Sequence, residues 1–449
     1  MAKSTGLTRR AFLRNSALTV GGLSLAGTGR VWSQSTATLR VGVIGCGGRG
    51  SGAAKNCVDS SPGVKIVALA DAFQDRLDGL KKAFPVAADH CFVGLDAYKA
   101  LLALSDVDLV ILATPPGFRP IHLAAAIAAG KHVFMEKPVA VCMAGINMVI
   151  EASKLAAEKK LAVVAGTQRR HEPKYLETMK RIHDGAIGDL VSAQCYWNMG
   201  GLWVHPREAG QSDVEWQLRN WLYFTWLSGD HIVEQHVHNL DVINWAFNSL
   251  PETIHAAGGR QFRTGPEYGH IFDHFGTEFI YPNDVRTIST CRQIVGSADR
   301  VGERVVGTKG ASDCCGTITG AKAWTYDGPN PDPYVCEHAD LIASIRKGDP
   351  LNEGVRIAQS TLCAIMARES AYSRQQFKRL WFENRCPLDL RPPADLKLSD
   401  ARPVPPVAVP GKYVLPGLEA SAPKAEGKAP PKAGAKADAR PKNKGARKN

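Results

Sequence analysis

The chain has 449 residues, 44% of them apolar, and a formal net charge of +12. This length suits two domains better than one ordinary core. The excess charge lies at the ends: residues 1–36 hold five basic and no acidic residues, residues 421–449 hold nine and two, and residues 37–420 hold 41 of each. A neutral middle argues against a core that binds nucleic acid.

Residues 1–36 are predicted to be an export segment. The run Thr8-Arg9-Arg10-Ala11-Phe12-Leu13-Arg14 is similar to the twin-arginine motif, and a weakly apolar stretch follows at 17–27. That stretch is too short to span a bilayer, and no later segment is apolar enough for an integral membrane helix. We therefore expect the twin-arginine translocase to deliver the folded protein to the periplasm or another extracytoplasmic location. The alternative is an ordinary basic amphipathic N-terminus.

Residues 37–166 alternate apolar strands with helices. We expect strands at 40–45, 65–71, 108–114, 132–136 and 161–166, and helices that include 120–130 and 142–160. Continuous apolar strands separated by helices predict a parallel sheet that is covered on both faces. The fold class expected for this first domain is therefore a doubly wound α/β sheet.

The pattern changes after residue 166. Strands expected at 191–197, 277–281 and 285–291 alternate polar and apolar residues, and helices are expected at 231–247, 334–347 and 352–373. We interpret residues 167–400 as a second domain of the α+β type with a mostly antiparallel sheet. Residues 401–449 begin with a proline-rich stretch and end in a basic tail. The tail, residues 421–449, cannot bury a core and is expected to be disordered.

A glycine-rich loop follows the first strand. Gly45-Cys46-Gly47-Gly48-Arg49-Gly50 fits the pattern Gly-x-Gly-x-x-Gly between a strand and a helix. Such glycines allow a tight turn and let backbone N–H groups approach a pyrophosphate. Asp71 ends the next strand, where a carboxylate binds the adenosine ribose and repels a 2′-phosphate, so NAD is predicted in preference to NADP although Arg76 lies nearby. The alternative is a purely structural turn.

Two further strand ends are expected to border the cofactor. Thr114 and Pro115 end the third strand, where the nicotinamide half would pass, and His122 follows on the next helix. Glu136-Lys137-Pro138 ends the fourth strand, at the edge of the sheet where doubly wound folds place their chemistry. A partly desolvated Lys137 there is suited to passing a proton to or from a substrate oxygen. By itself, the lysine reads equally well as a surface residue before a helix.

Together these motifs resemble the Gfo/Idh/MocA family, the glucose-fructose oxidoreductase and inositol dehydrogenase family. The resemblance rests on the glycine loop, Ala113-Thr114-Pro115-Pro116, Ala129-Gly130-Lys131-His132-Val133 and Glu136-Lys137-Pro138. It implies a Rossmann domain, a second domain with a large open sheet, and hydride exchange between a nicotinamide and a sugar or polyol carbon. It also implies that Lys137 is catalytic, that Glu136 and Lys137 lie at the cofactor, and that subunits pair through the open sheet as a homodimer or homotetramer.

Residues 228–241 are similar to the family's second motif, roughly G-G-G-x-x-x-D-x-G-x-H-x-x-D. His238 falls on the family's catalytic histidine and Asp241 on its acid. Glu234 stands where the family has an aspartate, and His236 stands where it has a glycine. The two departures leave the shape of the pocket and the identity of the substrate open.

If residues 231–247 form one helix, Glu234, His238 and Asp241 share one face. We predict that His238 accepts a proton from a substrate hydroxyl while Lys137 stabilises negative charge on the oxygen. Glu234 would orient the histidine or bind another hydroxyl, and Asp241 would contact substrate. The alternative is that these side chains only cap and hydrogen-bond a buried helix.

Other polar and aromatic residues are candidates for substrate contacts. Arg169 and Arg170 follow the fifth strand and are suited to binding hydroxyls or a carboxylate, with a structural ion pair as the alternative. Trp197 could cover the apolar side of a sugar ring, and Trp203 is a weaker candidate. No metal is predicted, because His236 and His238 point about 200° apart on a helix. His231 with Glu234 is the alternative metal pair.

Three functions are compatible with these residues. The first is an exported NAD-dependent dehydrogenase acting on a CH–OH group of a sugar or polyol. The second is an NAD-dependent glycosidase that oxidises its sugar transiently, and the third is a non-catalytic protein that binds sugar or dinucleotide. Because free NAD is scarce outside the cytoplasm, we expect the cofactor to be loaded before export and held tightly.

Overall fold

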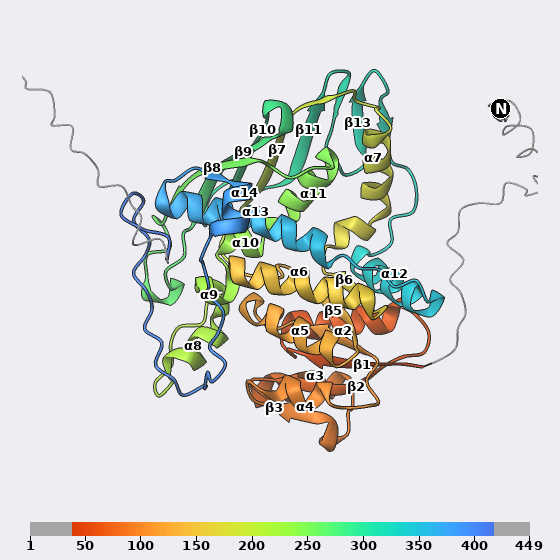
Figure 1. Ribbon diagram of the computed structural model, residues 1–449, viewed down its shortest axis with the longest axis vertical. Helices are drawn as coiled ribbons and strands as arrows, with labels where there is room; N and C mark the ends of the chain where they lie inside the picture. Colours follow the sequence, from red (N-terminus) through yellow and green to blue (C-terminus); the bar gives the residue numbers. More distant parts are fainter. Residues whose placement is uncertain (1–37, 417–449) are drawn as a thin grey trace, which may run out of the picture.

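The computed structural model describes residues 38–416, and it places two sheets one above the other with helices between and around them (Figure 1). The predicted export segment, 1–36, and the basic tail, 421–449, lie outside the described residues. No helix within the described part of the chain has the length and apolar character needed to cross a bilayer.

The first sheet is parallel and has the strand order β3-β2-β1-β4-β5-β6. Its strands are β1 (Leu39–Ile44), β2 (Val64–Asp71), β3 (Cys91–Val93), β4 (Leu109–Leu112), β5 (His132–Met135) and β6 (Val163–Ala165). The connecting helices are α2 (Gly48–Ser60), α3 (Gln74–Ala83), α4 (Ala97–Leu102), α5 (Arg119–Ala128) and α6 (Met143–Glu158). The doubly wound fold is confirmed. Its strand order reverses between β1 and β4, which opens a crevice at the carboxyl ends of these strands.

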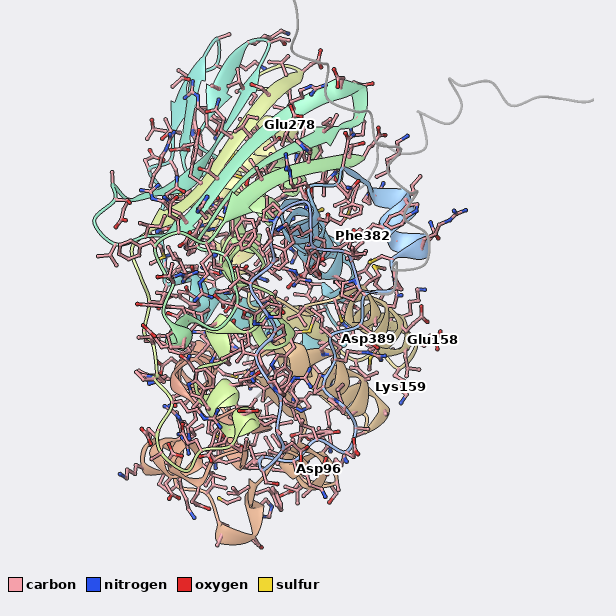
Figure 2. The ribbon with its side chains drawn as sticks, turned by 90° about the vertical axis from the view of Figure 1, so that its left-hand side faces the viewer. Asp96, Glu158, Lys159, Glu278, Phe382 and Asp389 are labelled. Carbon is pink, nitrogen blue, oxygen red and sulfur yellow. The ribbon has the colours of Figure 1, made fainter. Side chains whose placement is uncertain are left out.

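The second sheet has nine strands in the order β14-β13-β12-β11-β7-β10-β9-β8-β15, and Figure 2 shows its broad face with Glu278 on it. All pairings are antiparallel except that of β7 with β10, so the mostly antiparallel sheet is confirmed. The strands are β7 (Leu190–Met199), β8 (Thr253–Gly259), β9 (His274–Tyr281), β10 (Val285–Gln293), β11 (Arg300–Gly307), β12 (Gly310–Ser312), β13 (Thr317–Gly320), β14 (Trp324–Thr325) and β15 (Phe377–Lys378).

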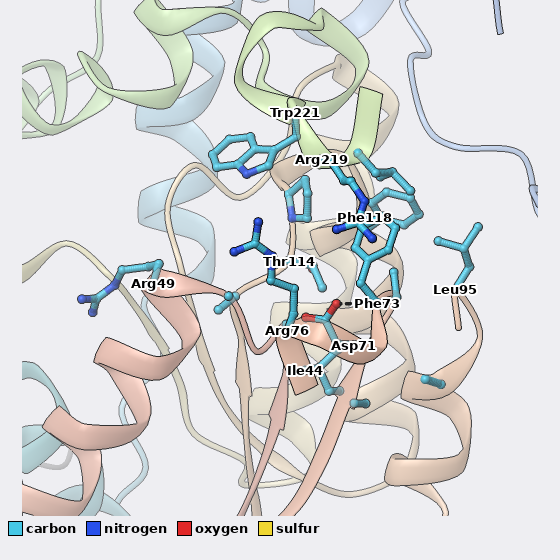
Figure 3. Close-up of a pocket in the computed structure, with 18 of the residues that line it drawn as sticks. Ile44, Arg49, Asp71, Phe73, Arg76, Leu95, Thr114, Phe118, Arg219 and Trp221 are labelled. Carbon is cyan, nitrogen blue, oxygen red and sulfur yellow. Dashed lines mark hydrogen bonds between the residues drawn. The ribbon is translucent and has the colours of Figure 1, made fainter. Parts of the chain in front are cut away.

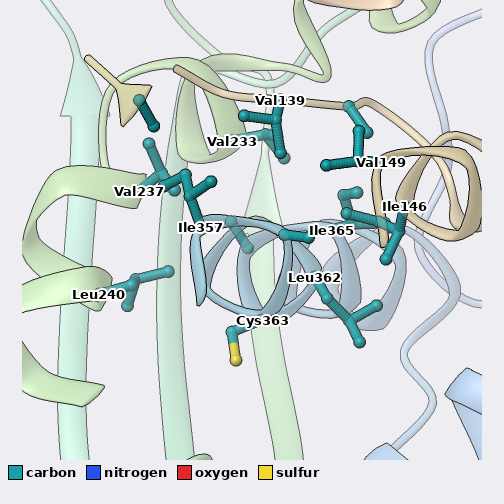
Figure 4. Packing of buried hydrophobic residues seen from close by; sticks show 14 of the residues in the cluster. Val139, Ile146, Val149, Val233, Val237, Leu240, Ile357, Leu362, Cys363 and Ile365 are labelled. Carbon is teal, nitrogen blue, oxygen red and sulfur yellow. The ribbon is translucent and has the colours of Figure 1, made fainter. Parts of the chain in front are cut away.

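Helix α13 (Gly354–Ser373) joins the two layers. It is buried along nearly all its length, and one apolar cluster continues from α6 through α13 to the second sheet. Each fully buried Leu or Ile contributes roughly 1.5–3 kcal/mol to folding, so this cluster fixes the two domains firmly against each other. Figure 4 shows Ile357, Leu362 and Ile365 of the helix packed among residues of both domains, namely Ile146, Val149, Val233 and Val237.

The chain returns to the first domain once after leaving it. Helix α12 (Pro333–Lys347) packs against α2, and Asn352 bridges Val163 of β6 in parallel register. The expected helix was found, but its position on the first domain was not foreseen. As a result α12 stands beside the glycine-rich loop, from which α2 begins.

The prediction of a single helix for residues 231–247 was wrong. The structure has two helices, α10 (His231–Glu234) and α11 (Val237–Phe247), with Gln235 and His236 between them. At the break, the His236 ring turns toward the second sheet, where its Nε2 lies 2.5 Å from Ser289 Oγ. Glu234 and His238 therefore do not share one helical face.

Two segments outside the sheets are defined here because they border the site. The outer-wall segment, residues 200–228, lies between β7 and α10 and contains α8 (Asp213–Arg219) and α9 (Thr225–Ser228). The C-terminal strap, residues 386–416, follows α14 (Arg379–Arg385). In Figure 1 the strap is the blue chain that descends to α8.

Candidate functional site

The glycine-rich loop has the open backbone that a dinucleotide pyrophosphate requires. Gly45 has φ 96°, and a Cβ on Gly50 would lie 1.8 Å from the Gly45 carbonyl oxygen, so the turn and the start of α2 both depend on glycine. A Cβ on Gly47 or Gly48 would instead meet nothing within 4 Å. The backbone at these two positions is thus free to approach a ligand at the N-terminus of α2.

Asp71 holds this loop from the end of β2. Its Oδ2 accepts a hydrogen bond from the Cys46 N–H at 2.6 Å, and its Oδ1 accepts one from the Phe73 N–H at 2.9 Å. Burial raises the pKa of the carboxyl. Each carboxylate oxygen keeps a lone pair for a further donor, as the adenosine ribose would supply.

A cavity of about 390 Å³ lies over the carboxyl ends of β1, β2 and β4 (Figure 3). Asp71 lines it and neither Lys137 nor His238 does, so we assign it to the adenosine half of a dinucleotide site. Thr114, Pro115 and His122, which we expected beside the nicotinamide half, line this cavity instead. Its first-domain wall includes the predicted residues Gly45, Gly47, Gly48, Arg49, Asp71, Thr114, Pro115 and His122. Its opposite wall consists of Trp203, His205, Leu218, Arg219 and Trp221. Of these, the sequence singled out only Trp203, and as a weak candidate for a substrate contact.

Arg119 ties together the loops after β4 and β5. Its buried guanidinium donates hydrogen bonds to the carbonyl oxygens of Thr114 and, at 2.5 Å, Pro138. The Thr114 hydroxyl also lies 3.1 Å from His122 Nδ1. Burial lowers the pKa of His122 to about 3, so this histidine is neutral and serves as a hydrogen-bonding wall residue. No pattern in the sequence had identified Arg119 as a residue of the site.

Arg49 connects the glycine loop to the Lys137 strand. Its Nε donates to Glu136 Oε1 at 2.5 Å, and its guanidinium lies 4.8 Å from the centre of the Tyr334 ring of α12. Glu337, also on α12, is fully buried 3.9 Å from Arg49 without a hydrogen bond from the described residues, and burial raises its pKa well above the usual value. Tyr334 and Glu337, which are far away in sequence, thus help to position Arg49 beside Glu136.

Lys137 and Glu234 meet at the edge between the two domains. Lys137 Nζ donates to Glu234 Oε1 at 2.8 Å and to the Glu234 carbonyl oxygen at 2.6 Å. The two side chains are 14% and 12% exposed, so the pair is largely shielded but still reachable. Glu234 ends α10, and its carboxylate binds Lys137. Orienting His238 was one of the two roles that we expected for Glu234.

His238 lies in the first turn of α11 and stacks on Trp197 of β7. The ring centres are 5.7 Å apart and the planes differ by 19°. Burial, reinforced by the charges of Lys137 and Arg169, lowers the pKa of His238 well below its ordinary value. Because its pKa is lowered, His238 is a neutral imidazole. No side chain in residues 38–416 hydrogen-bonds its ring, so a ring nitrogen is available to accept a proton.

Arg169 lies next to this stacked pair. Its guanidinium is 5.7 Å from the centre of the Trp197 ring, and it forms an ion pair with Glu303 of β11. Asn239 also donates to Glu303, at 2.5 Å. The structure therefore brings Arg169, Trp197 and His238 together, and Glu303 is a member of the group that the sequence did not reveal.

Arg170 and Asp241, which we expected to contact substrate, bind each other instead. Arg170 Nε donates to Asp241 Oδ2 at 2.8 Å, and Arg356 and Ser360 donate to the same carboxylate at 3.1 and 2.8 Å. Although burial opposes it, the charges of Arg170 and Arg356 hold the pKa of Asp241 far below its usual range. With its oxygens occupied and only 2% exposed, Asp241 is part of a structural ion cluster.

The alternative metal pair does not form a site. His231 is buried and its Nδ1 lies 2.9 Å from Asp230 Oδ1, while Glu234 binds Lys137. Within residues 38–416, no three His, Cys, Asp or Glu side chains are grouped so that they could hold a metal ion.

Two family profiles match the chain. Residues 39–167 match a profile described as the oxidoreductase family, NAD-binding Rossmann fold. Residues 175–312 match the GFO/IDH/MocA C-terminal domain. Together they cover more than half of the 449 residues and both domains seen in the structure.

Similar proteins include an inositol 2-dehydrogenase from Acidothermus cellulolyticus, which is 29% identical over 51% of this chain and 60% of its own length. The chain therefore spans about three fifths of that relative. Among solved structures, scyllo-inositol dehydrogenase from Lactobacillus casei with NAD(H) and scyllo-inositol has a TM-score of 0.60 at 19% identity, over 76% of this chain and 99% of that one. Aldose-aldose oxidoreductase from Caulobacter crescentus with glycerol has a TM-score of 0.62 at 17% identity over the same shares. These two structures share the fold.

Proposed function

Because the chain belongs to the Gfo/Idh/MocA family of oxidoreductases, we propose that it is an NAD-dependent dehydrogenase acting on a CH–OH group of a sugar or polyol. When bound, NAD⁺ accepts the hydrogen of the carbinol carbon together with its electron pair, and NADH returns it in the reverse direction. The hydroxyl proton leaves to a base of the protein, and the carbinol becomes a carbonyl group. The balance requires no other reactant.

His238 is the base in this proposal. A buried neutral imidazole that stacks on Trp197 is fixed in orientation and keeps a ring nitrogen available for the hydroxyl proton. Lys137 is the second catalytic group, since its ammonium can donate a hydrogen bond to the carbinol oxygen as negative charge develops there. Glu234 is a positioning residue that holds the lysine ammonium at 2.8 Å.

The observation that carries the proposal is that Lys137, which Glu234 binds, lies near His238 and follows Glu136, which Arg49 of the glycine loop binds. The charge of Lys137 contributes to the lowered pKa of His238, so the two groups lie within electrostatic range of each other. In this proposal the acid/base pair lies at the reacting end of the dinucleotide site, and neither residue lines the adenosine cavity. Arg169 and Trp197 border it and are proposed to bind substrate hydroxyls and a ring face.

A panel of polyols, aldoses and glycosides tests the proposal, with absorbance at 340 nm and product analysis as the measurements. We expect a carbonyl product and reduced cofactor from at least one polyol or aldose. Lys137→Met and His238→Gln should each lower the rate by about 10²–10⁴-fold, as loss of acid/base groups does. Cleavage of a glycoside without net redox turnover would instead favour an NAD-dependent glycosidase.

Export is a separate part of the proposal and rests on the twin-arginine-like run, which lies outside the described residues. We propose that the protein folds around NAD, crosses the membrane by the twin-arginine route and works outside the cytoplasm. Replacing Arg9 and Arg10 by lysine should retain the protein in the cytoplasmic fraction. An unchanged distribution between fractions would contradict this route.

We also propose that the second sheet pairs two subunits. Helices cover one face of the sheet, whereas Ile288 of β10 is 48% exposed on the other. Ile288→Glu should convert a dimer into a monomer in sedimentation velocity. A native protein that sediments as a monomer would contradict the proposal.

A further inference from the structure

The second domain supplies one whole wall of the adenosine cavity. Trp203, His205, Leu218, Arg219 and Trp221 all belong to the outer-wall segment, residues 200–228. In Figure 3, Arg219 and Trp221 lie across the cavity from Asp71 and Arg76. A Rossmann domain alone leaves this side of the dinucleotide open to solvent, so here release of the ligand depends on a second element.

The chemistry of this wall suits a flat heteroaromatic ring. The rings of Trp203 and Trp221 are 5.8 Å apart, and Trp203 remains 41% exposed although it is large and apolar. Aromatic faces stack on nucleobases, whatever the base, because every base has a π-face. The adenine of a dinucleotide bound along β1 and β2 would face these indoles.

Arg219 fastens the wall to the first domain. Its guanidinium lies 3.9 Å from the centre of the Phe73 ring, immediately after the strand that ends in Asp71. It also lies 3.3 Å from Asp75 Oδ1, at the start of α3. The arginine thus bridges the two sides of the cavity at the point where the adenosine ribose is expected.

The C-terminal strap fastens the same segment from behind. Asp213 Oδ2 accepts a hydrogen bond from the Arg402 N–H at 2.9 Å, and Gln217 donates to the Arg402 carbonyl oxygen at 2.5 Å. The Arg402 guanidinium lies 4.2 Å from the centre of a ring of Trp226, and Ser212 Oγ donates to the Leu398 carbonyl oxygen. Residues 396–402 lie outside the ranges that the two family profiles match.

We propose that Trp203, Arg219 and Trp221 bind the adenosine half of NAD, and that the strap holds them closed over it, so that NAD stays bound through successive turnovers. The inference rests on the NAD dependence of the proposed function but not on its acid/base residues. Release of NAD then requires the outer-wall segment to move away from Phe73 and Asp75. Exchange of cofactor with solvent is slower than catalysis as a result.

The test measures release of NADH from the full-length protein, by the loss of its fluorescence after excess NAD⁺ is mixed in. Trp221→Ala and Arg219→Ala should each release NADH at least about 10-fold faster than the parent protein, and Trp221→Phe should stay close to it because a ring is retained. The double variant Ser212→Ala/Arg402→Ala, which weakens the strap outside the cavity, should accelerate release as well. Lys180→Ala is the control, since its exposed pair with Asp184 at 3.0 Å lies outside the cavity, the outer-wall segment and the strap.

Equal release rates in the parent protein, Trp221→Ala and Arg219→Ala would overturn the inference, as would acceleration by Lys180→Ala to the same extent. If Trp221→Ala fails to fold, the test compares two other variants. Trp221→Phe should still release NADH slowly, whereas Arg219→Ala should release it at least about 10-fold faster than the parent protein. Lys137→Met should lower turnover by about 10²–10⁴-fold without the faster NADH release expected of Trp221→Ala. If no polyol is oxidised but release responds as expected, the proposed function fails while this inference stands.

Discussion

Lys137 Nζ lies 2.8 Å from Glu234 Oε1, and this contact joins the end of β5 in the first domain to the end of α10 in the second. The lysine ammonium also donates to the Glu234 carbonyl oxygen at 2.6 Å. The carboxylate therefore holds the ammonium in one direction before any substrate arrives. A group held in advance has little reorganisation to undergo when charge develops on the substrate oxygen.

Replacing Glu234 by glutamine should lower kcat/KM by about 10- to 100-fold. The side chain keeps its shape, but a charge-assisted hydrogen bond worth roughly 1.5–3 kcal/mol is lost. A positioning role predicts that kcat falls more than KM rises. Glu151→Gln, which removes an exposed pair with Lys154 at 2.9 Å, is the control and should leave both constants unchanged. A rise in KM alone would mean that Glu234 binds substrate directly.

Asp241→Asn should destabilise the protein by about 3–5 kcal/mol in urea unfolding. It leaves the charges of Arg170 and Arg356 buried without a full countercharge, and breaking a buried pair costs this much. Affinity for NADH should remain that of the parent protein. A stable variant with a strongly raised KM would restore Asp241 as a substrate contact.

Asp71→Ser should weaken NAD binding by about 10-fold or more and raise the relative affinity for NADP. The change removes the acceptor for the ribose hydroxyls and the repulsion of a 2′-phosphate, while Arg76 lines the same cavity. Displacement titrations with NADH and NADPH measure the ratio. Asp78→Ser, on an exposed position of α3, is the control. An unchanged ratio in Asp71→Ser would remove Asp71 from cofactor selection.

The free energy of unfolding should fall as the pH is lowered from about 6.5 to 4. Burial lowers the pKa of His122, His236 and His338 to about 3, and that of His270 to about 4. Histidines of the unfolded chain take up protons below about pH 6.5, whereas these four remain neutral in the fold. The unfolded state therefore binds more protons in this window, and acid favours it.

His338→Leu tests one member of this group. Neither ring nitrogen of His338 has a hydrogen bond from residues 38–416, and the ring centre lies 4.0 Å from that of Phe134. The substitution should reduce the slope of unfolding free energy against pH by up to about 1.4 kcal/mol per pH unit between pH 4 and 6.5. Urea titrations at several pH values measure the slope. An unchanged slope would show that His338 does not resist protonation in the fold.

Local features of the site were predictable because they depend on neighbours in sequence. Apolar strands, the spacing of the glycines from Gly45 and the acid at Asp71 are all set within one strand-turn-helix unit. The break before Val237 was not predictable from periodicity, since it accompanies a contact of His236 with Ser289 on another strand. Strands of two to four residues, such as β12 to β15, are too short to show alternation.

The features of the site that could not be predicted are contacts between segments far apart in the sequence. Glu303 pairs with Arg169 across 134 residues, and Arg219 reaches Asp75 across 144. Spacing along the chain carries no signal for such pairs, and neither does composition. For the same reason the sequence alone could not separate Arg169, which borders the stacked Trp197, from Arg170, which is held by Asp241.

The most direct test of the proposed chemistry follows one deuterium atom. Full-length protein is incubated with polyols and aldoses that carry deuterium on the carbinol carbon, then denatured, and the released dinucleotide is examined by mass spectrometry. We predict a reduced nicotinamide heavier by one mass unit from at least one compound, and none from Lys137→Met, which should still release a dinucleotide. A bound dinucleotide that never acquires deuterium from any of these compounds would contradict the proposal.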